Sequence, residues 1–334
     1  MSTPREDGLA MPAEWSPHAA TFMEWPTRVS LWGDLFEDAK RDYAEVANAI
    51  AAFEPVVMVA DPEQAHEARG YLTERVEILP IPIDDSWMRD NGPIFVTDGR
   101  GGVALVHFRF NGWGGRFEPY DRDADVPRRL AEHLGMRRYE APMVLEGGSF
   151  FVDGEGTLLT TEQCLLHPNR NPQMTREEIE RTLREYLGVD AIVWLARGHH
   201  LDRDTDGHVD GIAEYVRPGV VILHVPADPR DPDHEPAAEN LRRLREARDA
   251  RGRAFEVIAF EPGASVAAGL NLYLCNGAAI VPTDGTDADE PVLAQIRAAF
   301  PGRDVIPVPG RVLLEGGGGP HCITQQLPVG VPIP

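Results

Sequence analysis

The segment with the most distinctive reactive chemistry is Gly316–Gln326, with the sequence GGGGPHCITQQ. Four consecutive glycines, a proline and a histidine precede Cys322. A thiol near a histidine and backbone N–H groups can ionise readily, and the thiolate is the nucleophilic form. Flexible glycine backbone also lets a substrate come close. The segment predicts an exposed, reactive Cys322. By contrast, Cys164 and Cys275 lie in apolar, strand-like runs that are typical of buried cysteines.

A second segment, Gly198–Gly211, has the densest histidine and aspartate content of the chain. Its central aspartates match the opening of an EF-hand calcium loop, D-x-D-x-D-G. We reject that interpretation because the twelfth loop position, which must supply a bidentate glutamate, is Ala213. A zinc site lacks H-E-x-x-H or suitably spaced cysteines, and adventitious cation binding stays open. His208 and Asp210 are two residues apart, so in a strand they would face one pocket together.

Two further segments combine acids with turn-forming residues. Asp84–Pro93 (DDSWMRDNGP) ends in strong turn chemistry, but a turn does not explain Trp87 and Arg89. Glu146 ends an apolar run before two glycines, and the same string, LEGG, recurs at Glu315. The echo is either chance or a sign of equivalent positions in repeated units.

Alternating strand-like and helix-like runs predict an α/β fold. The expected strands are Val56–Ala60, Val103–Phe108, Thr157–Thr161, Ala191–Leu195, Val220–Val225 and Ala278–Pro282. The expected helices are Glu37–Ala52, Thr175–Leu187, Glu235–Arg251 and Pro291–Phe300. Thr175 followed by Glu178 forms a capping-box pattern at a helix start.

Composition narrows the function classes. The chain has 334 residues, with 32 Lys and Arg against 54 Asp and Glu, a net charge of −22. Such a chain repels nucleic-acid phosphates and attracts small cations. No stretch reaches the roughly 20 apolar residues that cross a bilayer, and the first residues carry no apolar signal-peptide core. We therefore expect a cytoplasmic protein with no nucleic-acid or membrane partner. Three cysteines without C-x-x-C fit neither a disulfide framework nor a structural zinc site.

Taken together, these segments resemble the agmatine deiminases, within the guanidine-modifying enzymes that also include arginine deiminases and amidinotransferases. Six strings carry the resemblance and occur in the family's order over nearly the whole chain. They are MPAEW at Met11–Trp15, SWMRDNGP at Ser86–Pro93, FNGWGG at Phe110–Gly115, LEGGSFFVDGEGTLLTTEQCLL at Leu145–Leu166, GHVDG at Gly207–Gly211 and HCITQQ at His321–Gln326.

The resemblance implies a fold and an assembly. The expected fold is a five-bladed α/β propeller, the pentein fold, built from ββαβ-type repeats with pseudo-fivefold symmetry and a central active site. Residues 1–334 would form a single catalytic domain. A homodimer is also implied.

The resemblance further implies a role for each site residue. Cys322 matches the nucleophile, His208 the general acid and base, and Glu146 the acid that partners the histidine. Asp90 and Asp210 match the carboxylates that hold a guanidinium, and Trp87 matches a wall of the pocket. The candidate substrate-binding residues are Trp87, Arg89, Asp90, Asp210 and Gly317.

The chemistry of a guanidinium agrees with this set. A planar, donor-rich cation is held well by carboxylates, and its carbon calls for a strong nucleophile such as a thiolate. The expected reaction is hydrolysis of agmatine to N-carbamoylputrescine and ammonia through an S-amidino (thiouronium) cysteine. No metal or organic cofactor is expected. We further expect the bound cation to help form the thiolate.

Several positions depart from the family pattern, notably Gly211 and Pro320. A further departure is the segment Gly269–Tyr273. These positions lie outside the predicted catalytic set and bear on the substrate beyond its guanidinium. Alternatives therefore remain: deimination of free or peptidyl arginine, or amidino transfer. A non-enzymatic binding protein disagrees with the intact set of Cys322, His208 and Asp90.

Overall fold

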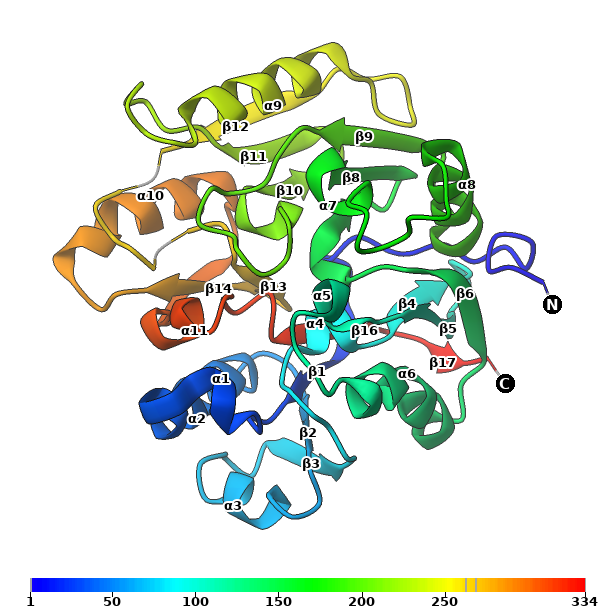
Figure 1. Cartoon of the computed structure of the whole chain (residues 1–334), viewed down its shortest axis with the longest axis vertical. Helices are drawn as coiled ribbons and strands as arrows, with labels where there is room; N and C mark the ends of the chain where they lie inside the picture. Colours follow the sequence, from blue (N-terminus) through cyan, green and yellow to red (C-terminus); the bar gives the residue numbers. More distant parts are fainter. Residues whose placement is uncertain (1, 262, 268, 334) are drawn as a thin grey trace.

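The computed structural model describes residues 2–261, 263–267 and 269–333, whose strands form five small sheets around the middle of the molecule (Figure 1). The first sheet has the order β16 (Thr324–Pro328), β1 (His18–Glu24), β2 (Val56–Ala60), β3 (Val76–Pro80). The second has the order β17 (Val331–Pro332), β5 (Gly102–Arg109), β4 (Ile94–Thr97), with β6 (Arg138–Val144) also paired to β5. The others are β7 (Phe150–Val152), β8 (Thr157–Thr161), β9 (Ala191–Leu195); β10 (Ala213–Arg217), β11 (Val220–His224), β12 (Glu256–Phe260); and β13 (Tyr273–Cys275), β14 (Ala278–Thr283), β15 (Asp304–Pro309).

All five sheets contain the same succession of pairings. An antiparallel pair is followed by a parallel pair, as in β7–β8 and β8–β9. Parallel neighbours need a crossover connection, usually a helix. The helices that supply it are α2 (Phe36–Ile50), α6 (Asp121–Leu134), α8 (Arg176–Leu187), α9 (His234–Glu246) and α10 (Glu290–Ala299). In the first sheet the antiparallel partner of β1 is β16, so segments from opposite ends of the chain share one sheet.

Shorter helices and turns connect these units and carry much of the polar chemistry. The short α-helices are α1 (Val29–Trp32), α3 (Ala65–Arg69), α4 (Met88–Asn91), α5 (Gly112–Gly115), α7 (Glu162–Leu165) and α11 (Arg311–Glu315). The 3-10 helices are η1 (Gly33–Leu35), η2 (Gly147–Ser149), η3 (Val209–Gly211) and η4 (Asp287–Asp289).

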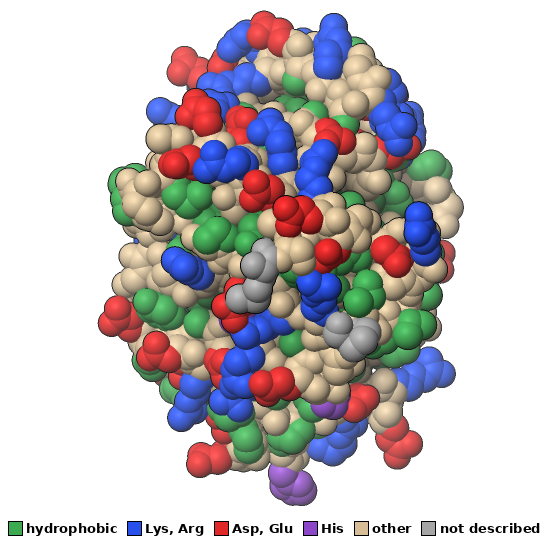
Figure 2. Space-filling view, turned by 90° about the vertical axis from the view of Figure 1, so that its right-hand side faces the viewer, with side chains coloured by type: hydrophobic (Ala, Val, Ile, Leu, Met, Phe, Trp, Pro, Cys, Tyr) green, Lys and Arg blue, Asp and Glu red, His purple; other side chains and the backbone are tan. Residues whose placement is uncertain are grey.

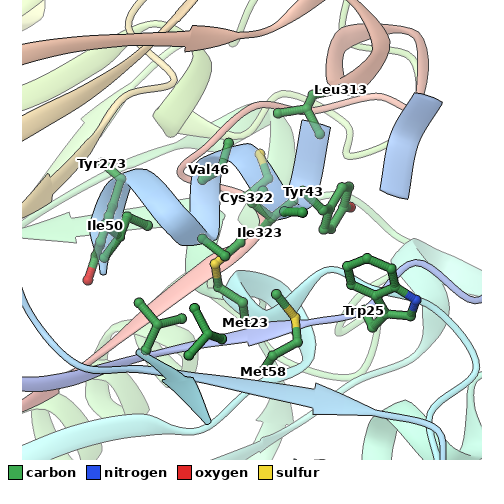
Figure 3. Packing of buried hydrophobic residues seen from close by; sticks show 14 of the residues in the cluster. Met23, Trp25, Tyr43, Val46, Ile50, Met58, Tyr273, Leu313, Cys322 and Ile323 are labelled. Atoms are coloured by element: carbon green, nitrogen blue, oxygen red, sulfur yellow. The ribbon is translucent and has the colours of Figure 1, made fainter. Parts of the chain in front are cut away.

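Apolar packing brings the helices onto the sheets. In the cluster of Figure 3, Tyr43, Val46 and Ile50 of α2 pack with Met23 of β1 and Met58 of β2. All five side chains are fully buried. The same cluster contains Cys322 and Ile323. The segment that carries the candidate nucleophile is therefore part of a core and not a free loop.

The predicted strands are confirmed within one or two residues, but some predicted features were wrong. The helix expected at Glu235–Arg251 ends at Glu246, and the chain then turns around the carboxylate of Asp249. Helix α6 was not predicted, because Pro127 and a strongly polar face obscure its apolar spacing. The capping box at Thr175 is confirmed.

The two LEGG strings come after strands with similar places in their sheets, since β6 pairs in parallel with β5 and β15 with β14. Glu146 follows strand β6 directly and is buried. Glu315 is the last residue of helix α11 and is exposed. The two strings therefore have different backbone structures.

The surface carries intermixed charges, and Figure 2 shows acidic and basic side chains alternating over one face. Among the described residues, no helix is both long enough and apolar enough to cross a bilayer.

Candidate active site

Cys322 lies in the turn between α11 and β16 and is 7% exposed, so the prediction of an exposed thiol was wrong. The side-chain amide of Asn271 donates a hydrogen bond to its Sγ at 3.1 Å. The Oδ2 atom of Asp210 lies 3.4 Å from the same sulfur. Cys322 thus meets one neutral donor and one carboxylate.

Two cavities in the described part of the chain border Cys322, with volumes of about 360 and about 20 Å³. His208 and Asp210 line the larger cavity. Trp87 and Asp90 line the smaller one. The residues that border both are Asp204, Thr205, Gly317 and Cys322. The predicted wall residues Trp87 and Gly317 therefore lie where a molecule beside the thiol would meet them.

Asp90 is held by two donors from distant segments. It lies on α4 and is 5% exposed. The indole N–H of Trp113 donates to Oδ2 at 2.8 Å, and the backbone N–H of Gly148 donates to Oδ1 at 2.9 Å. Trp113 has φ 53° and ψ 47°, a left-handed conformation that is rare for a bulky residue. Such strain often accompanies function, and here it accompanies the aiming of the indole at Asp90.

His208 and Asp210 face the same site, although not through the predicted strand. Val209–Gly211 is a 3-10 helix, and His208 precedes it. The surroundings of Gly148 show how closely His208, Asp210 and Asp90 approach one another. A Cβ on Gly148 would lie 2.7 Å from His208 Nδ1, 2.8 Å from Asp210 Oδ2 and 2.9 Å from Asp90 Oδ1.

The imidazole of His208 lies between two carboxylates. Its Nε2 is 3.7 Å from Oε2 of Glu146, and its Nδ1 is 3.9 Å from Oδ1 of Asp90. These are ion-pair distances, longer than hydrogen bonds. Burial lowers the pKa of His208, but the charge of Asp90 and the contacts with Cys164 and Glu146 outweigh it and hold that pKa well above its usual value. His208 is therefore set to carry a proton.

Cys164 lies beside this histidine. It is fully buried, as predicted, but it belongs to helix α7 and not to a strand. Burial raises the pKa of its thiol. Cys275 is buried in β13 as predicted.

Glu146 is kept ionised by a buried arginine. The Nε atom of Arg170 donates to its Oε1 at 2.6 Å. Burial alone would raise the pKa of Glu146, but Arg170 and His208 lower it. A second nitrogen of Arg170 donates to Asp206 at 2.7 Å. The loop that leads to His208 is thereby tied to the acid that partners it.

Arg89 does not line either cavity and forms part of a buried network behind the site. Its guanidinium donates to Oε2 of Glu14 at 3.2 Å. His321 bridges Glu14, at 3.0 Å, and Asp210, at 2.8 Å. Burial would raise the pKa of Glu14, but the charges of His321 and Arg89 bring it down to about 2. We therefore revise Arg89 from a substrate contact to a positioning residue that acts through His321 and Asp210.

Burial and nearby charges determine the protonation state of the Cys322 thiol before substrate binds. Burial raises the pKa of Cys322 well above its usual value, and the charges of Asp210 and Asp90 add to this. The amide of Asn271 acts in the opposite direction. In the free protein Cys322 is thus protonated near neutral pH.

Sequence reasoning missed four contributors to this geometry: Trp113, Gly148, Arg170 and Asn271. Trp113 and Gly148 lie within two of the strings that carry the family resemblance, but only the contacts show what they do. Asn271 falls in a segment noted as a departure from the family. Arg170 follows the Leu145–Leu166 string and had no signal of its own.

Three side-chain groups have the composition of metal ligands: Glu146, Cys164 and His208; Glu14, Glu214 and His321; and His199, His200 and Asp233. In the first two, a glutamate already forms an ion pair with a buried arginine. In the third, among the described residues, Asp233 forms ion pairs with histidines alone.

A model of the Porphyromonas-type peptidyl-arginine deiminase family matches residues 10–328, and the chain belongs to that family. It is 44% identical over 359 residues to the agmatine deiminase of Stutzerimonas stutzeri, covering 98% of this chain and 97% of the relative. It is 43% identical to the agmatine deiminase of Pseudomonas aeruginosa, with the same coverage. Its mixed α/β fold matches the structure of the agmatine deiminase of Enterococcus faecalis with a TM-score of 0.95, at 34% identity and 99% coverage of both chains.

Proposed function

We propose that this protein hydrolyses agmatine to N-carbamoylputrescine and ammonia, using Cys322 as a covalent nucleophile. The observation that carries the proposal is the convergence of Cys322, His208, Asp90 and Asp210 on one small volume beside Gly148. Relatives named agmatine deiminase at more than 40% identity support the choice of substrate.

Two carboxylates suit the binding step. A guanidinium offers paired N–H donors in one plane, which carboxylates accept well. Asp90 has its own donors in Trp113 and Gly148, and Asp210 has His321, so neither needs to move to receive the cation. The positive charge placed beside Cys322 offsets the effect of both carboxylates. Substrate binding therefore lowers the pKa of the thiol and favours the thiolate, and the thiol proton is released to solvent.

The first chemical step forms a bond between Sγ of Cys322 and the guanidinium carbon. The carbon–nitrogen bond to the terminal amino group then breaks, and His208 gives its proton to the departing ammonia. The raised pKa of His208 keeps this proton available. An S-amidino cysteine, a thiouronium, remains.

The second step uses water. Neutral His208 takes a proton from water, and the resulting hydroxide adds to the same carbon. The bond to Sγ breaks, the departing thiolate takes the proton of the added hydroxyl group, and the product carries a neutral ureido group in place of the guanidinium. Glu146 stabilises the imidazolium that forms again, because Arg170 keeps that glutamate ionised.

The rest of the substrate would extend into the larger cavity. Asp202, Asp204 and Asp231 contribute acids to its wall, and Arg203 is the one arginine or lysine there among the described residues. An amine at the far end of agmatine suits this balance of charge better than the carboxylate of free arginine. A peptidyl arginine lacks that free carboxylate and is the second candidate substrate.

The wider organisation belongs to the same proposal. We propose that the five sheets are the blades of a propeller of ββαβ units related by pseudo-fivefold symmetry. Residues 1–334 would act as one catalytic domain without a metal or organic cofactor for this reaction. A homodimer, a cytoplasmic location and the lack of nucleic-acid and membrane partners remain predictions.

The experiment measures ammonia release from agmatine, free arginine and a blocked peptidyl arginine, with Cys322→Ala alongside. Release from agmatine alone, abolished in Cys322→Ala, is the expected result. A mass increase on Cys322 during turnover, trapped by acid quenching, would identify the amidino adduct. Release from arginine substrates alone would overturn the choice of substrate. If the folded protein releases ammonia from none of the three substrates, the proposed deimination is overturned.

A further inference from the structure

A second polar cluster lies on the wall of the larger cavity, built from three segments that are distant in sequence. His199 and His200 follow strand β9, His224 ends strand β11, and Asp233 immediately precedes helix α9. All four residues line the cavity. None has a role in the chemistry proposed above.

Three imidazole nitrogens converge on one carboxylate oxygen. Oδ2 of Asp233 lies 2.6 Å from Nδ1 of His200, 3.1 Å from Nε2 of His199 and 3.8 Å from Nε2 of His224. The ligand atoms of His199, His200 and Asp233 lie within 4.8 Å of one another. The contact of His200 is a hydrogen bond, whereas His199 and His224 lie at ion-pair distances from the same oxygen.

His224 is the independent sign that the cluster takes a ligand. Its side chain is 9% exposed, and its Nε2 is buried without a hydrogen-bond partner among the described residues. Buried polar atoms are nearly always satisfied, so an exception calls for an explanation such as an ion. The unpartnered nitrogen faces the same carboxylate that holds the other two histidines.

The carboxylate is itself oriented as metal ligands usually are. The backbone N–H of His200 donates to Oδ1 of Asp233 at 2.8 Å, which leaves Oδ2 directed at the imidazoles. Such outer hydrogen bonds fix the ligands of metal sites.

We propose that His199, His200, His224 and Asp233 bind one divalent transition-metal ion of the zinc class. Imidazole and carboxylate ligands suit Zn²⁺, and four protein ligands complete the tetrahedral coordination typical of a structural site. The sequence showed no zinc spacing because the ligands come from three separate segments. The ion would anchor the start of the loop that runs from His199 to His208, and so would stiffen one wall of the cavity that contains Cys322.

Zinc binding to metal-free, full-length protein tests the site by calorimetry. We expect one Zn²⁺ per chain, with affinity lowered at least about tenfold by His199→Ala, His224→Ala or Asp233→Asn, since even outer partners of metal ligands are worth that much. His133→Ala, an exposed histidine on α6, is the matched control and should bind normally. Cys322→Ala should also bind normally. Circular dichroism and the melting temperature establish that each variant is folded.

Two further readouts separate this site from the cysteines. Co²⁺ should give visible d–d bands without a sulfur-to-cobalt charge-transfer band, and Zn²⁺ should raise the melting temperature of the wild type more than that of His224→Ala. Lack of Zn²⁺ binding overturns the proposal. So does binding that survives in both folded His224→Ala and Asp233→Asn, or that disappears in Cys322→Ala. None of these outcomes depends on whether agmatine is the substrate.

Discussion

At the scale of single residues, Gly148 governs the spacing of the catalytic groups. A methyl group there would lie within 3 Å of His208, Asp210 and Asp90, at the distances given above. We expect Gly148→Ala to lower kcat/KM about 100-fold, because a misplacement of about 1 Å costs that much. Gly211→Ala is the matched control, since a Cβ at Gly211 meets nothing within 4 Å. Steady-state kinetics with agmatine checks both. Equal loss in the two variants would contradict this account.

The thiol of Cys322 should control the pH dependence. Because its pKa is raised in the free enzyme and kcat/KM reports free-enzyme ionisations, kcat/KM should keep rising with pH beyond the usual thiol pKa of about 8.5. Asn271→Ala removes a donor to Sγ and should move this rise to higher pH. Asn271→Asp adds a negative charge and should move it further. pH–rate profiles of the wild type and of the two variants test this expectation. A profile that is unchanged in both variants would exclude a role for the Asn271 amide in setting the pKa of Cys322.

The sequence predicted which residues form the candidate site, but it did not predict the contacts that they make. The types and spacing around Cys322, His208 and Asp90 indicated the chemistry. The burial of Cys322 was not visible, since glycine-rich sequence reads as exposed loop and only the packing of Ile323 and its neighbours turns it inward. The part played by Arg89 was hidden for a similar reason, because its partners Glu14 and His321 come from opposite ends of the chain.

At the scale of elements, the loop before η3 depends on Arg170. Its guanidinium joins Glu146 to Asp206 and also donates to the carbonyl of Thr205 at 3.0 Å. Arg170→Met would leave the buried Glu146 without its arginine, whereas Asp206 keeps its ion pair with Arg116. Removing one partner of a buried pair costs about 3–5 kcal/mol. Without Arg170 the pKa of Glu146 should also rise, so activity should fall most at low pH.

Denaturant unfolding and pH–rate profiles of Arg170→Met check this expectation. Arg181→Met is the control, because its side chain is 63% exposed, and a surface change should stay within about 0.5 kcal/mol. Arg170→Lys keeps the charge but not the several N–H groups, and should be intermediate. If Arg170→Met is as stable and active as the control, the loop is held by something else.

Elements were predictable where local signals agreed. Strands such as Thr157–Thr161 and the capped helix at Thr175 were foreseen because apolar runs and caps are local. The 3-10 turn at Val209–Gly211 was mistaken for a strand, since alternation over so few residues fits either structure. The pairing of β16 with β1 joins residues some 300 positions apart, and no local pattern encodes it.

At the scale of the whole molecule, a net charge of −22 should speed the capture of a cationic substrate. Salt screens such long-range attraction, with a Debye length of about 10 Å at 0.1 M. We expect kcat/KM to fall as NaCl rises, and to fall more steeply for agmatine, a dication, than for a monocationic alkylguanidine of the same length. Steady-state assays at constant pH measure the two slopes. The monocation is the control for salt effects on the enzyme itself, because both substrates meet the same Cys322. Equal slopes would mean that the overall charge does not guide the substrate, and that recognition rests on contacts inside the cavity alone.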